Sequence, residues 1–218
     1  MQSEPKLPDP ALRRRLGFAL AAVLLLLLLA NHLVQQQAAS DRLRGLADAA
    51  RLAEAGPQRI VYPVGALPVL QLPGGQSRAV RSLIRVREKL TYGDFLWNDT
   101  APAPGQVWIR VDLARQLISV FRGQDEIGTA VILYGAPEKP TPRGTFQVIG
   151  KAVDHYSRSY DAPMPFMLRL TSDGVAIHAS PVRANGATHG CLGVPRQFAE
   201  QLYSVAATGT KVFILDER

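Results

Sequence analysis

Apolar and polar residues follow two different patterns along this chain. Residues 16–30 form an unbroken run of apolar or small side chains, and no charged residue occurs between Arg15 and Asp41. From residue 106 onward, apolar residues occur in short runs separated by turn-forming residues, which is typical of β-strands. The chain therefore divides into an apolar N-terminal segment and a β-rich C-terminal half.

The apolar run predicts a transmembrane signal anchor over residues 16–34. Three consecutive arginines, Arg13–Arg15, precede it, and residues 31–34 extend it to about the twenty residues that a bilayer requires. The positive-inside rule then makes residues 1–15 a basic cytoplasmic tail and places the rest of the chain outside the cytoplasm.

A cleaved signal peptide is the alternative to this anchor. Cleavage requires small residues at the −3 and −1 positions. Cutting after Ala30 would place Leu28 at −3, and cutting after Ala39 would place Gln37 there. The uncleaved anchor is therefore favoured.

Residues 35–104 are predicted to form a stalk and linker with irregular and helical segments. Residues 41–55 are alanine-rich with leucines at helical spacing, and the Gly-Pro pair that follows predicts the end of a helix. Prolines make residues 60–72 extended and irregular, and the basic stretch over 77–90 is expected to be helical. A Pro- and Ala-rich segment at 101–105 marks the next boundary.

The C-terminal domain, residues 105–218, is predicted to be mainly β. Strands are expected at 107–112, 116–121, 127–134, 145–149, 166–170, 174–178 and 211–215, and a helix at 196–206. Many short strands with one or two helices indicate a sandwich or barrel-like fold, preceded here by the transmembrane helix and helical stalk.

The composition narrows the range of partners. The formal charge of +7 modestly favours anionic partners such as membrane headgroups or an acidic polymer, but a solvated basic surface is the favoured explanation. No basic stretch is interleaved with aromatic residues and no cysteine pair is present, so we expect no nucleic-acid partner. The histidines and the cysteine match no common zinc-ligand spacing, so we expect no metal.

The single cysteine, Cys191, is the strongest candidate for chemistry. Outside the cytoplasm cysteines are usually paired, so a lone thiol there has no obvious structural purpose except as a small buried apolar residue. A thiolate attacks acyl carbon, and an imidazole can take the thiol proton. His178, thirteen residues upstream at the end of a predicted strand, is assigned as general base, and His189 as a supporting group.

Backbone groups complete the predicted site. No carboxylate is close in sequence to His178, so a backbone carbonyl such as that of Ala179 is the simplest partner to orient the ring. Gly190 allows a sharp turn beside Cys191, and the amides of Gly190, Cys191 and His189 are candidates to hold an oxyanion. The implied reaction class is acyl transfer.

These residues resemble the catalytic domain of L,D-transpeptidases, the YkuD family. The family motif is a histidine, a spacer and Ser/Thr-x-Gly-Cys, which His178 and residues 188–191 match. The resemblance extends over about residues 106–216. Four further elements match in order: the hairpin at 107–121, Lys-Pro-Thr-Pro-Arg-Gly-Thr-Phe at 139–146, Met-Pro-Phe at 164–166, and Thr-Gly-Thr-Lys-Val at 208–212.

The resemblance implies a transferase without metal or cofactor that acts on peptidoglycan stem peptides. Cys191 would attack the carbonyl of the third stem residue, release D-alanine and pass the acyl group to an amine. We expect a single-pass protein of the bacterial inner membrane with its catalytic domain in the periplasm or cell wall compartment. A cysteine peptidase or carboxypeptidase that trims stem peptides or cross-links, and a non-catalytic wall-binding module, are the alternatives. The oligomeric state is left open.

The chain departs from the family pattern after the cysteine. An aliphatic residue and then arginine or asparagine is usual there, but this chain has Leu192 and Gly193. The common Ser-Thr-Gly run is likewise replaced by residues 132–135, Ile-Leu-Tyr-Gly. The candidates for substrate binding are Met164, Tyr160, Thr188, Arg183 and Asn185. Arg196 is a further candidate for the missing polar group, and His155 and Tyr156 either line the acyl groove or pack a loop.

Overall fold

The computed structural model describes residues 25–40, 42–43, 58–100 and 102–216. The chain separates into two compact units, Met1–Ala47 and Asp48–Arg218.

The first unit contains a helix. Residues 25–40 and 42–43 are helical and their side chains are exposed. They include the second half of the predicted anchor. The predicted tail over 1–15, the first residues of the anchor and most of the helix expected over 41–55 lie outside the described residues. Within the described ranges, no helix has both the length and the apolarity that a membrane crossing requires.

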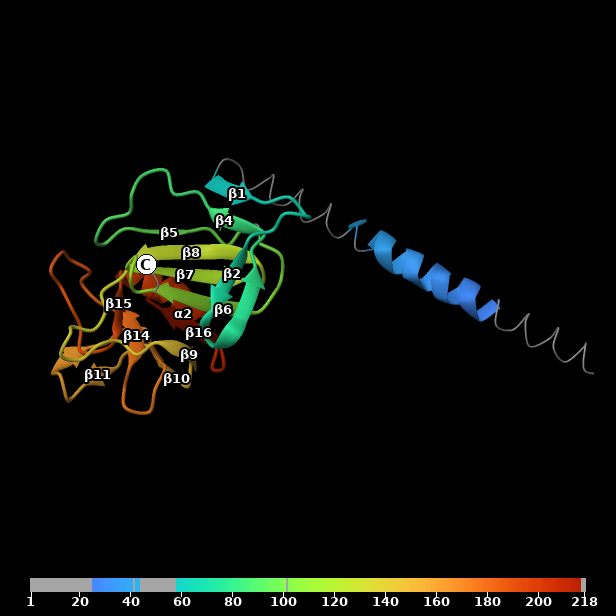
Figure 1. The fold of residues 1–218 in the computed structure, drawn as a ribbon. Helices are drawn as coiled ribbons and strands as arrows, with labels where there is room; N and C mark the ends of the chain where they lie inside the picture. The colour runs from blue at the N-terminus through green and yellow to red at the C-terminus, as the bar shows by residue number, and fades with distance from the viewer. Residues whose placement is uncertain (1–24, 41, 44–57, 101, 217–218) are drawn as a thin grey trace, which may run out of the picture. The chain divides into compact units, whose positions relative to one another are not determined.

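The second unit is built around an eight-stranded mixed sheet (Figure 1). Its strands pair in the order β1-β4-β8-β7-β6-β16-β9, and β5 also pairs with β8. The strands are β1 (Arg59–Val61), β4 (Ser82–Ile84), β5 (Phe95–Trp97), β6 (Val107–Asp112), β7 (Leu117–Arg122), β8 (Asp125–Val131), β9 (Gly144–Gln147) and β16 (Lys211–Leu215). β6, β7 and β8 form an antiparallel meander, and β16 runs parallel to β6.

A smaller, four-stranded sheet in the order β10-β13-β14-β15 carries the candidate site. The remaining elements are β2 (Val69–Leu72), the 3₁₀ turn η2 (Pro73–Gly75), β3 (Gln76–Ala79), β10 (Gly150–Ala152), β11 (Tyr156–Ser157), β12 (Ala162–Pro163), β13 (Met167–Arg169), β14 (Ala176–Ala179), β15 (Leu192–Val194) and α2 (Arg196–Val205). Leu133, just after β8, exchanges backbone hydrogen bonds of 2.9 and 3.0 Å with Gly193 of β15. This bridge joins the small sheet to the large one.

Both faces of the large sheet are buried. Because successive residues of a strand point to opposite sides, one strand contributes side chains to two separate apolar clusters. Ile109 and Val111 of β6 belong to the main core, which they share with the small sheet and α2. Trp108 belongs to a second cluster on the other face, where its ring stacks on Phe121 with centroids 4.2 Å apart. Leu72, at the end of β2, packs into that second cluster. The meander is thus held from both sides.

The mainly β fold class is confirmed. In the part of the chain that the structure describes, the helices are the N-terminal one and α2, apart from short 3₁₀ turns. α2 and β16 occur where the sequence predicts a helix and a last strand. β1, β4 and β5 lie within residues 35–104, the predicted stalk and linker, and pair into the same sheet as β6, β7 and β8. The domain boundaries themselves stay a prediction.

The prediction of a helix over residues 77–90 is wrong. This stretch contains most of β3 and all of β4. Val80, Ser82 and Ile84 are buried, whereas the residues between them are more exposed, which is the two-residue period of a strand. The mixed basic and apolar composition therefore reflects an alternating strand and not an amphipathic helix.

A buried polar cluster holds β1 and β4 against β8. Arg59 donates to the Ser82 hydroxyl at 2.8 Å, and that hydroxyl donates to Asp125 at 2.7 Å. The carboxylate of Glu126 accepts a hydrogen bond from the Ile84 backbone at 2.9 Å. These partners are more than twenty residues apart in sequence, so no local pattern reveals them.

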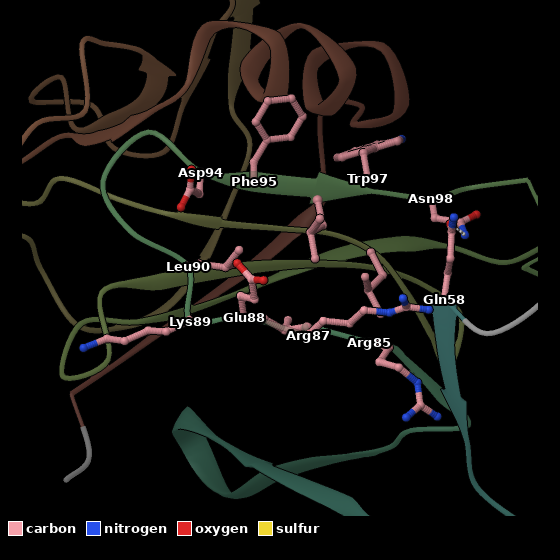
Figure 2. A pocket seen from close by; sticks show the side chains of 13 residues that line it. Gln58, Arg85, Arg87, Glu88, Lys89, Leu90, Asp94, Phe95, Trp97 and Asn98 are labelled. Carbon is pink, nitrogen blue, oxygen red and sulfur yellow. Dashed lines mark hydrogen bonds between the residues drawn. The ribbon is translucent and has the colours of Figure 1, made fainter.

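Figure 2 shows a cavity of about 600 Å³ between β5 and the segment over residues 85–90. The rings of Phe95 and Trp97 point away from it toward α2, where both meet Phe198 edge-on. β5 is therefore fastened to the core by its aromatic side chains. No residue that lines this cavity also lines the cavity of the candidate site.

Candidate active site

Cys191 lies in the turn before β15, at the wall of a cavity of about 340 Å³. Its side chain is half-buried and packs against Met164, Met167 and Ala176. The thiol lies 3.7 Å from the backbone carbonyl oxygen of Gly174. The sulfur is thus sheltered on one side and open to the cavity on the other.

Two hydroxyl groups hold the turn that carries the cysteine. Thr188 Oγ1 donates to the Cys191 carbonyl at 2.5 Å, and Thr141 Oγ1 donates to the Gly190 carbonyl at 3.0 Å. Gly190 has φ of 101°, a conformation that favours glycine. Within the described residues, the N–H groups of His189, Gly190 and Cys191 donate to no other backbone group. The turn is therefore fixed by its carbonyls while its amides stay available.

Sequence reasoning missed the part that Gly135 and Thr141 play in this turn. The Gly135 N–H donates to Thr141 Oγ1 at 2.9 Å. A Cβ at Gly135 would lie 2.2 Å from the Lys139 carbonyl oxygen and 2.6 Å from the Thr141 nitrogen. Only glycine lets residues 139–141 pass this close, so Gly135 places the threonine that holds Gly190. The available signal was the proline-flanked threonine in the segment over 139–146.

His178 lies in β14, with a buried ring whose orientation is fixed by the backbone. Its Nδ1 is 2.9 Å from the carbonyl oxygen of Ala179. Since a carbonyl only accepts, Nδ1 carries the proton and Nε2 has the free lone pair. The prediction that the Ala179 carbonyl orients the imidazole is confirmed.

The small sheet brings the cysteine and histidine segments together. β14 and β15 pair in parallel, with Ile177 opposite Leu192 and His178 opposite Gly193. Cys191 immediately precedes Leu192, so it sits at the entrance of the strand beside that of His178. The two residues thus come from neighbouring strands, as the separate-segment assignment requires.

Packing explains the glycine that stands where the family usually has arginine or asparagine. A Cβ at Gly193 would lie 2.9 Å from Ser180 Cβ and 3.4 Å from Leu133 Cβ. The contact with Leu133 is an ordinary one, but the approach to Ser180 is too close for two carbon atoms unless one of them shifts. The space beside this backbone is therefore already occupied in this chain.

Both candidate catalytic groups favour their neutral forms. Burial lowers the pKa of His178, the Ala179 hydrogen bond opposes this, and nearby His155 lowers it further. Burial raises the pKa of the Cys191 thiol; the Ala176 backbone hydrogen bond and the charge of Lys139 oppose the rise. At neutral pH the resting site therefore holds a neutral thiol and a neutral imidazole and not a preformed ion pair.

The predicted substrate-binding residues divide into two groups. Met164 and Tyr160 line the Cys191 cavity, as do His155 and Tyr156. Thr188 does not line it but bonds the Cys191 carbonyl.

Arg183 and Asn185 lie in an exposed loop and do not line the cavity. The guanidinium of Arg196 lies 5.3 Å from the centre of the Phe166 ring. None of these three residues therefore takes the place of the missing polar group beside Cys191. In the described ranges no cluster of His, Cys, Asp and Glu side chains could hold a metal ion.

His189 stacks on an aromatic ring from another segment. Its ring and that of Tyr160 have centroids 4.6 Å apart and planes inclined by 18°. Tyr160 belongs to the loop between β11 and β12. The stack therefore ties this loop to the turn that carries Cys191.

Comparison with known proteins gives a consistent family. The family model of the L,D-transpeptidase catalytic domain, YkuD, matches residues 106–214. A protein named probable L,D-transpeptidase 3 of Mycobacterium tuberculosis is 29% identical over 112 residues, which cover 44% of this chain and 41% of that relative. The chain thus spans about two fifths of the length of this curated relative.

Two solved structures align with about half of this chain. An L,D-transpeptidase from Stackebrandtia nassauensis aligns with 21% identity over 53% of this chain and 58% of its own, with a TM-score of 0.49. An L,D-transpeptidase from Mycobacterium tuberculosis H37Rv aligns with 23% identity over 50% and 57%, with a TM-score of 0.47.

Proposed function

This chain belongs to the family of L,D-transpeptidase catalytic domains, and on that premise we propose that it is a cell-wall transpeptidase with Cys191 as its acyl carrier. One observation carries the proposal. The sulfur of the only cysteine is open to a cavity, and the adjacent strand holds a histidine whose Nδ1 is committed to the Ala179 carbonyl. That arrangement leaves Nε2 to act as a base.

The first half-reaction forms a thioester. His178 Nε2 takes the thiol proton as the Cys191 sulfur attacks the carbonyl carbon of the third residue of a stem peptide. The tetrahedral intermediate collapses, the C–N bond breaks, and the amine of D-alanine leaves with the proton from His178. Because both resting groups are neutral, proton transfer accompanies the attack and does not precede it.

The turn before the cysteine supplies the oxyanion site in this proposal. The N–H groups of His189, Gly190 and Cys191 have no backbone acceptor among the described residues. Thr141 and Thr188 hold the carbonyls on the same turn, which fixes the amides before substrate arrives. Such preorganised donors stabilise a developing negative charge at little reorganisation cost.

The second half-reaction transfers the acyl group. An amine of another stem peptide attacks the thioester, His178 takes a proton from that amine, and the released sulfur leaves as a thiolate that regains the proton. With water as acceptor the same steps give a carboxypeptidase. The cellular site that we propose is the outer side of a bacterial inner membrane, which the arginines and apolar run near the N-terminus support.

The proposed reaction is tested by product analysis. The full-length chain, in detergent, is incubated with a tetrapeptide stem, with and without a second stem that offers a free amine. We expect released D-alanine and a cross-linked dimer that forms only when the amine acceptor is present. If only trimmed tripeptide forms, even with excess amine, the activity is that of a carboxypeptidase and the proposed transpeptidase is wrong. Unchanged tetrapeptide would reject both.

A further inference from the structure

Lys139 reaches across the cavity of Cys191 from the loop before β9. Its Nζ donates a hydrogen bond of 2.6 Å to Tyr160 Oη, in the loop between β11 and β12. Both residues line the cavity together with Cys191. The ring of Tyr160 in turn stacks on His189. Lys139 therefore connects two walls of the cavity on which the sulfur opens.

The backbone of Lys139 lies against the turn that carries the cysteine. A Cβ at Gly190 would lie 3.7 Å from the Lys139 carbonyl oxygen and 3.8 Å from Lys139 Cγ. Two residues further on, Thr141 bonds the Gly190 carbonyl. The start of the lysine side chain is thus fixed next to the amides that we assign to the oxyanion.

The charge of Lys139 is not neutralised by contact. Among the described residues, no carboxylate forms a salt bridge with it, and its hydrogen-bond partner is the Tyr160 hydroxyl. That hydrogen bond raises the pKa of Lys139, so the ammonium group stays charged at neutral pH. Asp173 is near enough to interact with this charge but not to pair with it.

The cavity as a whole carries more positive than negative charge. Its charged lining residues are Lys139, Arg158 and Arg169 and a single acidic residue, Asp173. The guanidinium of Arg169 already donates to two backbone carbonyls of the loop after β13. Lys139 is therefore the cation that combines a fixed position with an unpaired charge beside the candidate nucleophile.

We propose that Lys139 and Tyr160 form a carboxylate subsite that recognises the acidic group next to the scissile bond of the acyl donor. The ammonium group supplies the charge. Tyr160 Oη accepts from Lys139 and still has its own O–H to donate, so two donors converge on one anion. This inference rests on the proposed function, since a terminal D-alanine places its carboxylate one residue beyond the attacked carbonyl.

The subsite predicts substrate selectivity. Donors with a free terminal carboxylate bind productively, whereas donors amidated at that position leave the ammonium group without a partner. A site built to bind a charged group discriminates against the analogue that lacks it.

Two small reagents test the subsite without any stem peptide. Iodoacetate and iodoacetamide alkylate a thiolate in the same way: the sulfur attacks the CH2 carbon, a C–S bond forms, the C–I bond breaks and iodide leaves. They differ in the carboxylate that only iodoacetate carries. Because the chain has one cysteine, the rate of mass gain reports Cys191 alone.

The measured quantity is the rate ratio of iodoacetate to iodoacetamide. We expect Lys139→Met to lower this ratio about fivefold or more, and Lys139→Arg to keep it within about twofold of the wild-type value. Arg158→Met removes the same charge from the same cavity and is the matched control, with an expected change under about twofold. A ratio unchanged in Lys139→Met, or lowered equally in Arg158→Met, overturns the subsite.

The wild-type chain offers a second readout if a variant does not fold. Raising sodium chloride from about 0.02 to 0.5 M screens an exposed lysine, so the rate ratio should fall toward that of a free thiol. A ratio that does not respond to salt contradicts the proposal.

Two tetrapeptides that differ only in their terminal group, a free acid and an amide, test whether the subsite acts in the proposed reaction. The wild-type chain should release the terminal residue from a tetrapeptide acid about tenfold faster than from its terminal amide, and Lys139→Met should lose this preference. Equal wild-type rates would overturn the subsite while leaving the transpeptidase intact. Absence of any turnover, with the reagent ratio still dependent on Lys139, would instead reject the proposed function alone.

Discussion

The hydroxyl of Thr141 donates a hydrogen bond of 3.0 Å to the carbonyl of Gly190, forty-nine residues further along the chain. The same hydroxyl oxygen accepts from the Gly135 N–H at 2.9 Å. One buried side chain therefore joins the end of the β8 segment to the turn that carries Cys191. The position of the candidate nucleophile depends on this contact as much as on its own strand.

Replacing Thr141 with valine should loosen the turn. The shape is nearly retained, but the Gly135 N–H and the Gly190 carbonyl lose their partner, which costs about 1–3 kcal/mol of unfolding free energy. Urea unfolding measures this loss, and alkylation of Cys191 by iodoacetamide reports the changed turn. Thr141→Ser keeps the hydroxyl and should remain close to wild type in both. A valine variant as stable as wild type would show that the contact does not hold the turn.

Restoring the family-typical side chain at position 193 should destabilise this chain. Gly193→Asn forces a Cβ to within 2.9 Å of Ser180 Cβ, which costs about 1–3 kcal/mol through overpacking. Removing the obstacle in the double variant Gly193→Asn with Ser180→Gly should recover part of that loss. If the single variant unfolds at the wild-type urea concentration, the packing explanation for this glycine fails.

Removal of the buried Arg59 charge should detach the strands before residue 106. Arg59→Met leaves the Ser82 hydroxyl and the backbone carbonyls of Asn98 and Glu126 without their guanidinium donor, with an expected cost of about 1–3 kcal/mol. Asp125 keeps its ion pair with Arg81. Arg85→Met, at an exposed position of the neighbouring segment, is the matched control and should change the free energy of unfolding by less than about 0.5 kcal/mol. Equal effects of the two substitutions would contradict the buried network.

The reactivity of Cys191 should rise steeply with pH. Burial raises the thiol pKa, so the alkylation rate with iodoacetamide should keep increasing beyond the range in which a free thiol levels off. Lys139 opposes this rise, so Lys139→Met should shift the profile to still higher pH. A profile that levels off below that of a free thiol would instead indicate a preformed thiolate.

Stability should decrease on the acid side because of His178. Its folded-state pKa lies below the ordinary value of 6.5, so between the two values the unfolded state binds more protons. The free energy of unfolding should therefore fall as pH decreases from about 6.5 toward the lower folded-state pKa. His178→Gln should flatten this part of the pH profile, and an unchanged slope would show that the ring titrates normally.

The sequence predicts those elements whose signal is local. β6 and β7 are short runs rich in apolar residues, α2 places Phe198, Ala199 and Leu202 on one buried face, and β16 is apolar from Val212 to Leu215. The thiol, the imidazole and the Ala179 carbonyl follow from the chemical demands of a nucleophile that needs a base.

The features of the fold and of the site that the sequence does not predict depend on contacts between distant segments. β4 is recognisable only when Ser82 is seen to bond Asp125, and the stacking of Tyr160 on His189 depends on the fold that brings their loops together. The role of Thr141 is hidden for the same reason, because its acceptor lies in another loop. Neither the periodicity of the sequence nor the residue types reveal these contacts.

Intact-mass spectrometry of the full-length chain, quenched in acid shortly after mixing with a tetrapeptide stem, tests the central claim most directly. We predict a mass gain equal to the donor minus D-alanine, located on the tryptic fragment over residues 184–196, which contains Cys191. The gain should be absent in Cys191→Ser and much slower in His178→Gln. An adduct elsewhere in the chain, or one that forms equally fast without the His178 imidazole, would contradict the account.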